Sequence, residues 1–273
     1  MLGATKHGAK ALLRFCYAWL GLLLALVALV PLLPLIDPTR QDLGQEYVFS
    51  AAGHWLGTGE NGIDLASNLA WGMRLSVGLA FASVLLSSLL GLLWGGFAAS
   101  RGGLIERLFL VVVDVADAFP GLLLVIALAS VLGPRPENVV IALVMGSWVG
   151  YARLARAQVL SLREEPYVEA VRALGIPSWR RFLRHVAPQM LPSFFVKMTY
   201  GLSSAILAEA SLGFLGLGSP PGTPSWGQLL MQSRDVLTSA PHALLVPGVS
   251  LTLTVFAVNV VGDDLRDKLE GIR

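Results

Sequence analysis

Long apolar segments alternate with short polar ones along most of the chain. A helix needs about 20 mostly apolar residues to cross a hydrocarbon layer roughly 30 Å thick. Segments of this length can be marked off six times, at residues 12–36, 75–100, 108–132, 139–160, 194–217 and 243–261. We therefore predict an all-α membrane protein with six transmembrane helices embedded in a lipid bilayer.

The composition supports this class. Hydrophobic residues make up 55% of the chain and charged residues 14%, whereas about a quarter of the residues in a soluble domain are charged. The single cysteine, Cys16, lies in an apolar segment, which excludes a disulfide framework or a cysteine metal site within this chain.

The first apolar segment follows Lys6, Lys10 and Arg14, as the core of a signal peptide would. Its apolar length exceeds that of a signal-peptide core, and it lacks a clear small-residue cleavage site. We interpret it as a retained membrane anchor.

Positive charges are distributed unevenly among the polar segments. With a cytoplasmic N-terminus and six spans, only four of the 20 Lys and Arg residues fall outside, namely Arg40, Arg74, Arg135 and Arg234. Because short cytoplasmic loops carry an excess of Lys and Arg, we predict that both termini are cytoplasmic. The chain then divides into an N-terminal helix with an extracytoplasmic loop, residues 1–74, and a five-helix core, residues 75–273.

A polar segment at residues 163–192 separates the fourth and fifth spans, on the cytoplasmic side in this orientation. Pro166 suits a first helical turn, and Gly175 followed by Pro177 is a strong stop signal. Between them, Tyr167, Ala170, Val171 and Leu174 share one apolar face, and Glu169 and Arg172 point away from it. The pattern predicts a short amphipathic helix that ends at a glycine hinge.

A second short helix is predicted directly after the hinge. Ser178 can cap it, and its apolar positions are Trp179, Phe182, Leu183 and Val186. The remaining face is basic, with Arg180, Arg181, Arg184 and His185. Such a face suits either lipid headgroups or a partner protein, and the sequence leaves both open.

The chain has none of the usual nucleotide-binding, catalytic or metal-ligating patterns. The GxxxxGK[ST] spacing that cradles nucleotide phosphates is missing, as is any HExxH pair or paired nucleophile and base. His54, His185 and His242 have no metal-ligand spacing. We therefore expect neither an enzyme nor a metal or cofactor site in this chain.

The segment at residues 163–192 resembles the EAA loop of the permease subunits of bacterial ABC importers. The matching residues are Glu169, Ala170, Gly175 and Pro188. Val171 in place of the second alanine and Ala187 in place of the leucine before the proline depart from the pattern.

Further blocks in the same order resemble the second permease of dipeptide, oligopeptide and nickel importers. They are Asp114 with AFP at 118–120, LGP at 132–134, YARLARAQVLSLRE from Tyr151, RHVAP from Arg184, LGFLGLGSPPGTPSWG from Leu212 and NVVGDDLRD from Asn259. Together with the outer loop, they cover the chain from about residue 55 to its end. The outer loop departs most, because GTGENGID at residues 57–64 stands where the family usually has GTDxxGRD.

The resemblance implies a type I importer permease fold and a role as a pore subunit in a bacterial or archaeal plasma membrane. It also implies a second permease subunit, two cytoplasmic ATPase subunits that carry ATP and Mg²⁺, an extracytoplasmic solute-binding protein and no nucleic acid. The residues that it assigns to contact with the ATPase are Tyr167, Glu169, Ala170, Arg172, Ala173, Gly175 and Pro188. Closure of the ATPase would then change which side of the membrane the pore faces.

Four polar residues inside the predicted spans are candidates for the pore lining or for fixing helix register: Asp114, Asp117, Glu209 and Asn259. Ionisable groups at membrane depth are costly and indicate function by default. For the acids we consider backbone groups, Asn259 and Ser211 as bonding partners.

A secondary transporter driven by an ion gradient is the alternative function, although no inverted repeat is detectable. The sequence leaves the solute open among peptides, nickel chelates and sugars, and it leaves open whether the pore is a heterodimer or a homodimer.

Overall fold

The computed structural model describes residues 2–32, 38, 40–49, 53–269 and 271 of the chain. Regular structure in these residues is helical, apart from one isolated bridge between Thr58 and Asp64. The α-helices are α1 (Leu2–Leu29), α2 (Leu65–Arg101), α3 (Gly103–Asp117), α4 (Gly121–Leu132), α5 (Pro136–Leu162), α6 (Pro166–Ala173), α7 (Ser178–Arg181), α8 (Ala187–Phe214), α9 (Trp226–Gln232) and α10 (Pro241–Leu269). Short 3₁₀ turns lie at Val30–Leu32, Leu43–Gln45 and Glu60–Gly62, and a π-turn lies at Phe182–Val186.

Four stretches of helix are long and apolar enough to cross a membrane: Lys10–Leu32, Leu65–Arg101, Pro136–Leu162 and Pro241–Leu269. A fifth is reached if α3 and α4 count as one broken span. Helix α8 has a similar length of 28 residues but carries Lys197 and Glu209, which lower its apolar character. The all-α class is confirmed, and the count of six spans stays a prediction.

The third predicted span, residues 108–132, is wrong as a single straight helix. Helices α3 and α4 meet at an angle of 80°, and the break lies at Ala118–Pro120. Proline has no N–H to donate and disfavours a helical conformation in the residue before it, here Phe119, which explains the break.

Helix α2 begins ten residues before the predicted start of the second span. The Asp64 side chain accepts a hydrogen bond from the backbone N–H of Ser67 at 2.8 Å, which caps the helix. The resulting 37-residue helix is about 55 Å long at 1.5 Å per residue, so it extends well beyond a bilayer core. The last span is likewise longer than predicted, because α10 continues through the polar residues to Leu269.

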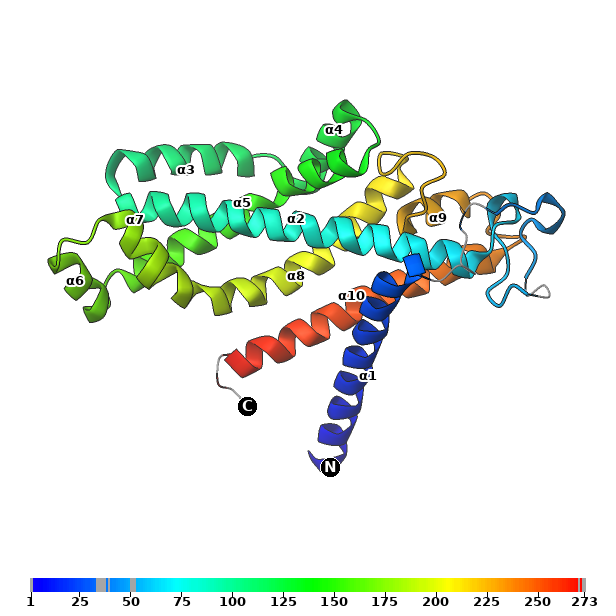
Figure 1. Cartoon of the computed structure of the whole chain (residues 1–273), viewed down its shortest axis with the longest axis horizontal. Coiled ribbons are helices and arrows are strands. Elements are labelled where there is room, and N and C mark those ends of the chain that lie inside the picture. The colour runs from blue at the N-terminus through cyan, green and yellow to red at the C-terminus, as the bar shows by residue number, and fades with distance from the viewer. Residues whose placement is uncertain (1, 33–37, 39, 50–52, 270, 272–273) are drawn as a thin grey trace.

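Helix α2 is the central element of the fold (Figure 1), with α5 and α8 beside it and α1 against α10 on one side. Helices α6 and α7 lie at one end of the molecule, and α9 lies with the outer loop at the other end. These two polar regions therefore lie at opposite ends of the bundle, and the side of the membrane that each faces stays a prediction.

Close contact between α2 and α5 depends on glycine. A Cβ at Gly95 would lie 2.3 Å from the carbonyl oxygen of Ala152, and one at Gly91 would lie 2.5 Å from Cβ of Tyr151. Neither position has room for a side chain, so these two glycines set how closely the helices pack.

The glycine-rich segment after α8 ends that helix in a regular way. Gly216 has φ +74°, and the N–H of Leu217 donates to the carbonyl of Leu212 at 2.8 Å. This is a Schellman cap, which satisfies the last carbonyls of the helix. The chain then turns back, so that Gly227 of α9 packs on Gly213 of α8.

Candidate functional site

The two-helix segment at residues 163–192 has the predicted architecture. Helix α6 ends at Ala173, Gly175 takes the left-handed conformation with φ +74°, and α7 begins at Ser178. The N-cap of α7 is Pro177 and not Ser178, which is the first helical residue; its predicted capping role is wrong. Nothing lies within 4 Å of a Cβ built on Gly175, so backbone conformation, and not crowding, requires glycine there.

Helix α6 is held to the rest of the chain through one side only. Val168 is 3% exposed and belongs to the main hydrophobic core. The predicted apolar face points elsewhere, since Ala170 is exposed, Tyr167 is 37% exposed and Leu174 is 78% exposed. An apolar face left open beside a well-anchored residue is typical of a surface that another protein covers.

Charged and polar groups border this open face. Glu169, Arg172 and Ala173 are exposed on α6, and Pro188 is exposed in the first turn of α8. Partial burial and then the charge of Glu165 raise the pKa of the Tyr167 hydroxyl above its usual value.

The second short helix leads without interruption into α8. Its continuation, the π-turn at Phe182–Val186, buries Phe182 and Val186 at 2% and 3% exposure, whereas Trp179 and Leu183 remain 46% and 49% exposed. Of the four predicted apolar positions, only these two therefore face the core. They fasten the segment to α2 and α8.

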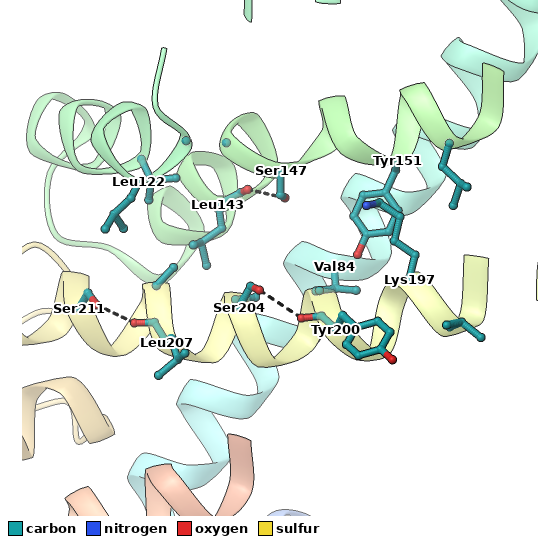
Figure 2. A pocket seen from close by; sticks show the side chains of 18 of the residues that line it. Val84, Leu122, Leu143, Ser147, Tyr151, Lys197, Tyr200, Ser204, Leu207 and Ser211 are labelled. Carbon is teal, nitrogen blue, oxygen red and sulfur yellow. Dashed lines mark hydrogen bonds between the residues drawn. The ribbon is translucent and has the colours of Figure 1, made fainter. Parts of the chain in front are cut away.

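A cavity of about 860 Å³ lies further along the bundle, between α4, α5 and α8 (Figure 2), with one residue each from α2 and α10, namely Val84 and Arg266. Its walls are mostly apolar, for example Leu122, Leu143 and Leu207, with serines and two tyrosines among them. Lys197 of α8 lies in its wall, with Nζ 5.4 Å from the ring centroid of Tyr151 on α5. A cavity of this size matches the volume range of small-molecule sites.

The acidic residues of α3 form ion pairs on its surface. Arg153 of α5 lies 3.2 Å from Asp114 and 2.8 Å from Asp117, measured between nitrogen and oxygen. A second pair, Arg156 with Glu106 at 2.8 Å, joins the same two helices and is less exposed. Thus the partner of both aspartates is Arg153, and not Asn259 or Ser211 as considered from the sequence.

Glu209 is fully buried in α8 and does not line the cavity. Its neighbour is Ser76 of α2, whose hydroxyl also accepts a hydrogen bond from the backbone N–H of Trp226 at 3.1 Å. Asn259 lies half-buried on α10. The four polar residues singled out from the sequence therefore do not come together in one site.

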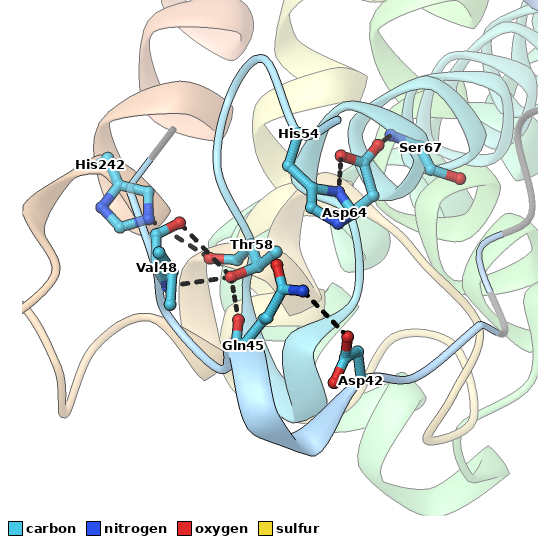
Figure 3. Close-up of polar contacts among 8 residues, drawn as sticks. All are labelled: Asp42, Gln45, Val48, His54, Thr58, Asp64, Ser67 and His242. Carbon is cyan, nitrogen blue, oxygen red and sulfur yellow. Dashed lines mark hydrogen bonds and ion pairs between the residues drawn. The ribbon is translucent and has the colours of Figure 1, made fainter. Parts of the chain in front are cut away.

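The outer loop is folded onto the start of α2 and the start of α10 (Figure 3). His54 Nδ1 lies 2.9 Å from Asp64, the residue that caps α2, and the backbone N–H of Val48 donates to the Thr58 hydroxyl at 2.9 Å. His242 Nε2 approaches the Thr58 carbonyl at 3.3 Å. Positive φ angles at Gly57, Asn61 and Gly62 allow these turns.

Three structural features were not predicted from the sequence: Lys197 in the cavity wall, Arg153 as the partner of the aspartates, and Phe182 in close contact with α2. Helical spacing alone cannot show them, because each depends on which helices are neighbours. Within the described residues, no group of three or more His, Cys, Asp or Glu could hold a metal ion.

Comparison with known proteins connects this geometry to a family. Residues 87–270 match the family model described as the binding-protein-dependent transport system inner membrane component. The chain is 39% identical over 220 residues to the dipeptide transport system permease protein DppC of Alkalihalophilus pseudofirmus, covering 81% of this chain and 72% of that protein. It is 37% identical over 249 residues to the nickel transport system permease protein NikC of Escherichia coli K12, covering 91% and 90%.

A solved structure, the MetNI methionine ABC transporter in inward-facing conformations, shares the fold. The TM-score is 0.59 at 19% identity, and the match covers 74% of this chain and 95% of that one. This likeness shows a type I importer permease fold. The chain therefore belongs to the family of binding-protein-dependent transport system inner membrane components, and it is a permease component of an ABC importer of the peptide and nickel type.

Proposed function

We propose that this chain forms part of the pore and that a separate ATPase drives it by docking on α6. The single observation that carries the proposal is the open apolar face of α6, with Leu174 78% exposed, on a helix whose other side is fixed by buried Val168. In this arrangement the apolar face fills a cleft on the ATPase, and Glu169 and Arg172 make polar contacts at its rim. Tyr167, Ala170 and Ala173 complete the docking surface.

A continuous route carries movement from α6 to the pore. Gly175 is the hinge, α7 and the π-turn follow it, and Pro188 lies where the π-turn passes into α8. Because Phe182 is held against α2, displacement of α6 is passed on to α8 and α2 together. Alternating access then follows as a hinge movement of packed helices.

The transmembrane arrangement in this proposal has six spans, with α3 and α4 as one broken span and α8 as another. Both termini and α6 lie in the cytoplasm, because the polar segment around α6 is rich in arginine. The outer loop and α9 lie outside, where a solute-binding protein delivers its ligand. The membrane is the plasma membrane of a bacterium or an archaeon.

The complete importer contains a second permease subunit, two ATPase subunits and a solute-binding protein. ATP and Mg²⁺ bind to the ATPase subunits, and this chain holds no cofactor. The solute is a dipeptide, an oligopeptide or a similar small molecule, as the names of the relatives suggest. In this scheme Asp114, Asp117, Glu209 and Asn259 fix helix register and do not line the path.

Docking is tested with Leu174→Glu, which places a charge on the open face. We expect co-purification of the ATPase subunits in mild detergent to be lost and ATP-driven uptake to stop, while the chain stays in the membrane. Leu43→Glu is the matched control, because Leu43 is 72% exposed in the outer loop, and we expect it to retain the ATPase. Retention of the ATPase and of uptake by Leu174→Glu would contradict the docking proposal.

A further inference from the structure

Lys197 is a cation near the start of the fifth predicted span, residues 194–217, and its side chain is half-buried in the bundle. It lies ten residues after Ala187, the first residue of α8, which corresponds to about 15 Å along the helix axis. A charged side chain that is partly buried costs free energy unless it meets water, a counter-ion or another polar group. Some polar or negatively charged group must therefore offset the cost of burying the Lys197 ammonium.

The surroundings of Lys197 supply no negative charge. Its Nζ atom lies over the Tyr151 ring and would be 3.4 Å from a Cβ on Gly150. Among the residues that the structure describes, no Asp or Glu forms an ion pair with Lys197, and no Asp or Glu lines the cavity. The aromatic ring face offsets only part of the cost, since an ammonium group also has three N–H donors to satisfy.

Most other polar groups of the cavity wall are already engaged, and the exception among the described residues is the buried Tyr151 hydroxyl, which has no hydrogen-bond partner. Ser147 donates to the Leu143 carbonyl at 2.7 Å and contacts Ser87 at 2.8 Å. Ser204 and Ser211 likewise donate to carbonyls of their own helix. The Tyr200 hydroxyl lies 2.6 Å from Asp263, beyond the cavity rim. Figure 2 shows Lys197 reaching across from α8 to Tyr151, so its ammonium group and the Tyr151 hydroxyl have donors to offer in this wall. Arg266 of α10, which lies beside Tyr200, adds a second positive charge to the same wall.

We infer that Lys197 binds the negatively charged group of the solute, such as the C-terminal carboxylate of a peptide, as the solute passes through this cavity. An ammonium donates charge-assisted hydrogen bonds to a carboxylate, and a half-buried, mostly apolar wall strengthens them relative to water. The volume of about 860 Å³ leaves room for a solute of dipeptide size. This inference rests on the proposed function and specifies the solute chemistry at one residue.

The test uses the complete importer in proteoliposomes with its permease, ATPase and binding-protein partners. The two probes are alanyl-alanine and its C-terminal amide, each at a concentration that saturates the binding protein, so that the rate reports passage through the membrane. We expect wild type to import the free acid faster than the amide. Lys197→Gln should slow the free acid about tenfold, as for loss of one charge-assisted hydrogen bond, and leave the amide nearly unchanged. Lys197→Arg should restore the preference.

Lys10→Gln is the matched control, because it removes the same charge from α1, away from the cavity. Equal slowing of both probes by Lys197→Gln would overturn the inference and indicate that Lys197 pairs with a carboxylate of the second permease. Unchanged uptake of both probes by Lys197→Gln would overturn it as well. If the wild-type importer takes up neither probe, the proposal that its solute is a peptide is wrong. The inference about Lys197 then fails for that separate reason.

Discussion

Phe182 of the π-turn packs directly against Gly96 of α2. A Cβ built on Gly96 would lie 2.3 Å from Cζ of the Phe182 ring, and Phe182 is only 2% exposed. This contact joins the two-helix segment to the central helix of the bundle. In the mechanism that we propose, a movement of α6 reaches the membrane helices through this contact.

Gly96→Ala should therefore damage coupling. The added methyl forces the ring out of its position, and overpacking of this kind costs about 1–3 kcal/mol of stability. We expect a lower melting temperature in detergent and ATP hydrolysis that no longer yields proportionate uptake. Gly78→Ala is the control in the same helix, because nothing lies within 4 Å of its Cβ position. A similar loss in Gly78→Ala would show that α2 tolerates no added methyl and that the Phe182 contact is not special.

The sequence predicts those helix ends that neighbouring residues in the chain determine. Gly175 and Pro177 define the end of α6 through backbone chemistry alone. The burial of Val168 and the exposure of Leu174 instead depend on how α6 packs on the bundle. The break between α3 and α4 has a local cause in Pro120, but apolar composition alone hides it, because the apolar end of α3 and the strongly apolar α4 together form a stretch long enough to be marked as one span. A span count based on hydropathy cannot detect such a bend.

Contacts between residues that lie far apart in the chain could not be predicted from the sequence. The partner of Asp114 and Asp117 is Arg153, 36 or more residues away along the chain, and the choice among many arginines depends on how α3 lies on α5. The sequence places Lys197 near the start of a predicted span and so among the cytoplasmic positive charges. Its contact with the Tyr151 ring depends on the packing of α5 against α8, which no single segment specifies.

Gly175→Asp should uncouple the importer without removing it from the membrane. At φ +74° an aspartate is strained, and it also brings a negative charge beside the open face of α6. We expect normal amounts of chain in the membrane fraction and loss of ATP-driven uptake. Gly133→Asp places the same residue at a similar angle, φ +84°, in the turn between α4 and α5, also with nothing within 4 Å. Uptake should survive in that control, and normal uptake by Gly175→Asp would count against the hinge.

Glu209→Gln should preserve both stability and uptake. Glu209 is fully buried beside Ser76, and neither of its carboxylate oxygens has a hydrogen-bond partner among the described residues. Glutamine has nearly the same shape and removes the cost of burying a charge. Glu209→Ala should instead lower the melting temperature, because it leaves an unfilled space in a close-packed region. The measurement is thermal unfolding in detergent together with the initial rate of uptake. Loss of uptake in a stable Glu209→Gln variant would assign the carboxylate to the transport path.

Of the three ion pairs between α3 and α5, the pairs Glu106–Arg156 and Asp114–Arg153 should contribute unequally. Glu106 and Arg156 have side chains that are 15% and 32% exposed, whereas Asp114 and Arg153 are 70% and 49% exposed. Solvent screens the second pair more strongly, so its coupling should be small. Double-mutant cycles with Glu106→Gln and Arg156→Gln, and with Asp114→Asn and Arg153→Gln, measure both couplings from unfolding in detergent. The Glu106 cycle should give the larger coupling and the weaker dependence on salt. The reverse order would mean that lipid or a partner subunit covers Asp114 and Arg153, since only exclusion of water from that face would make the more open pair the stronger one.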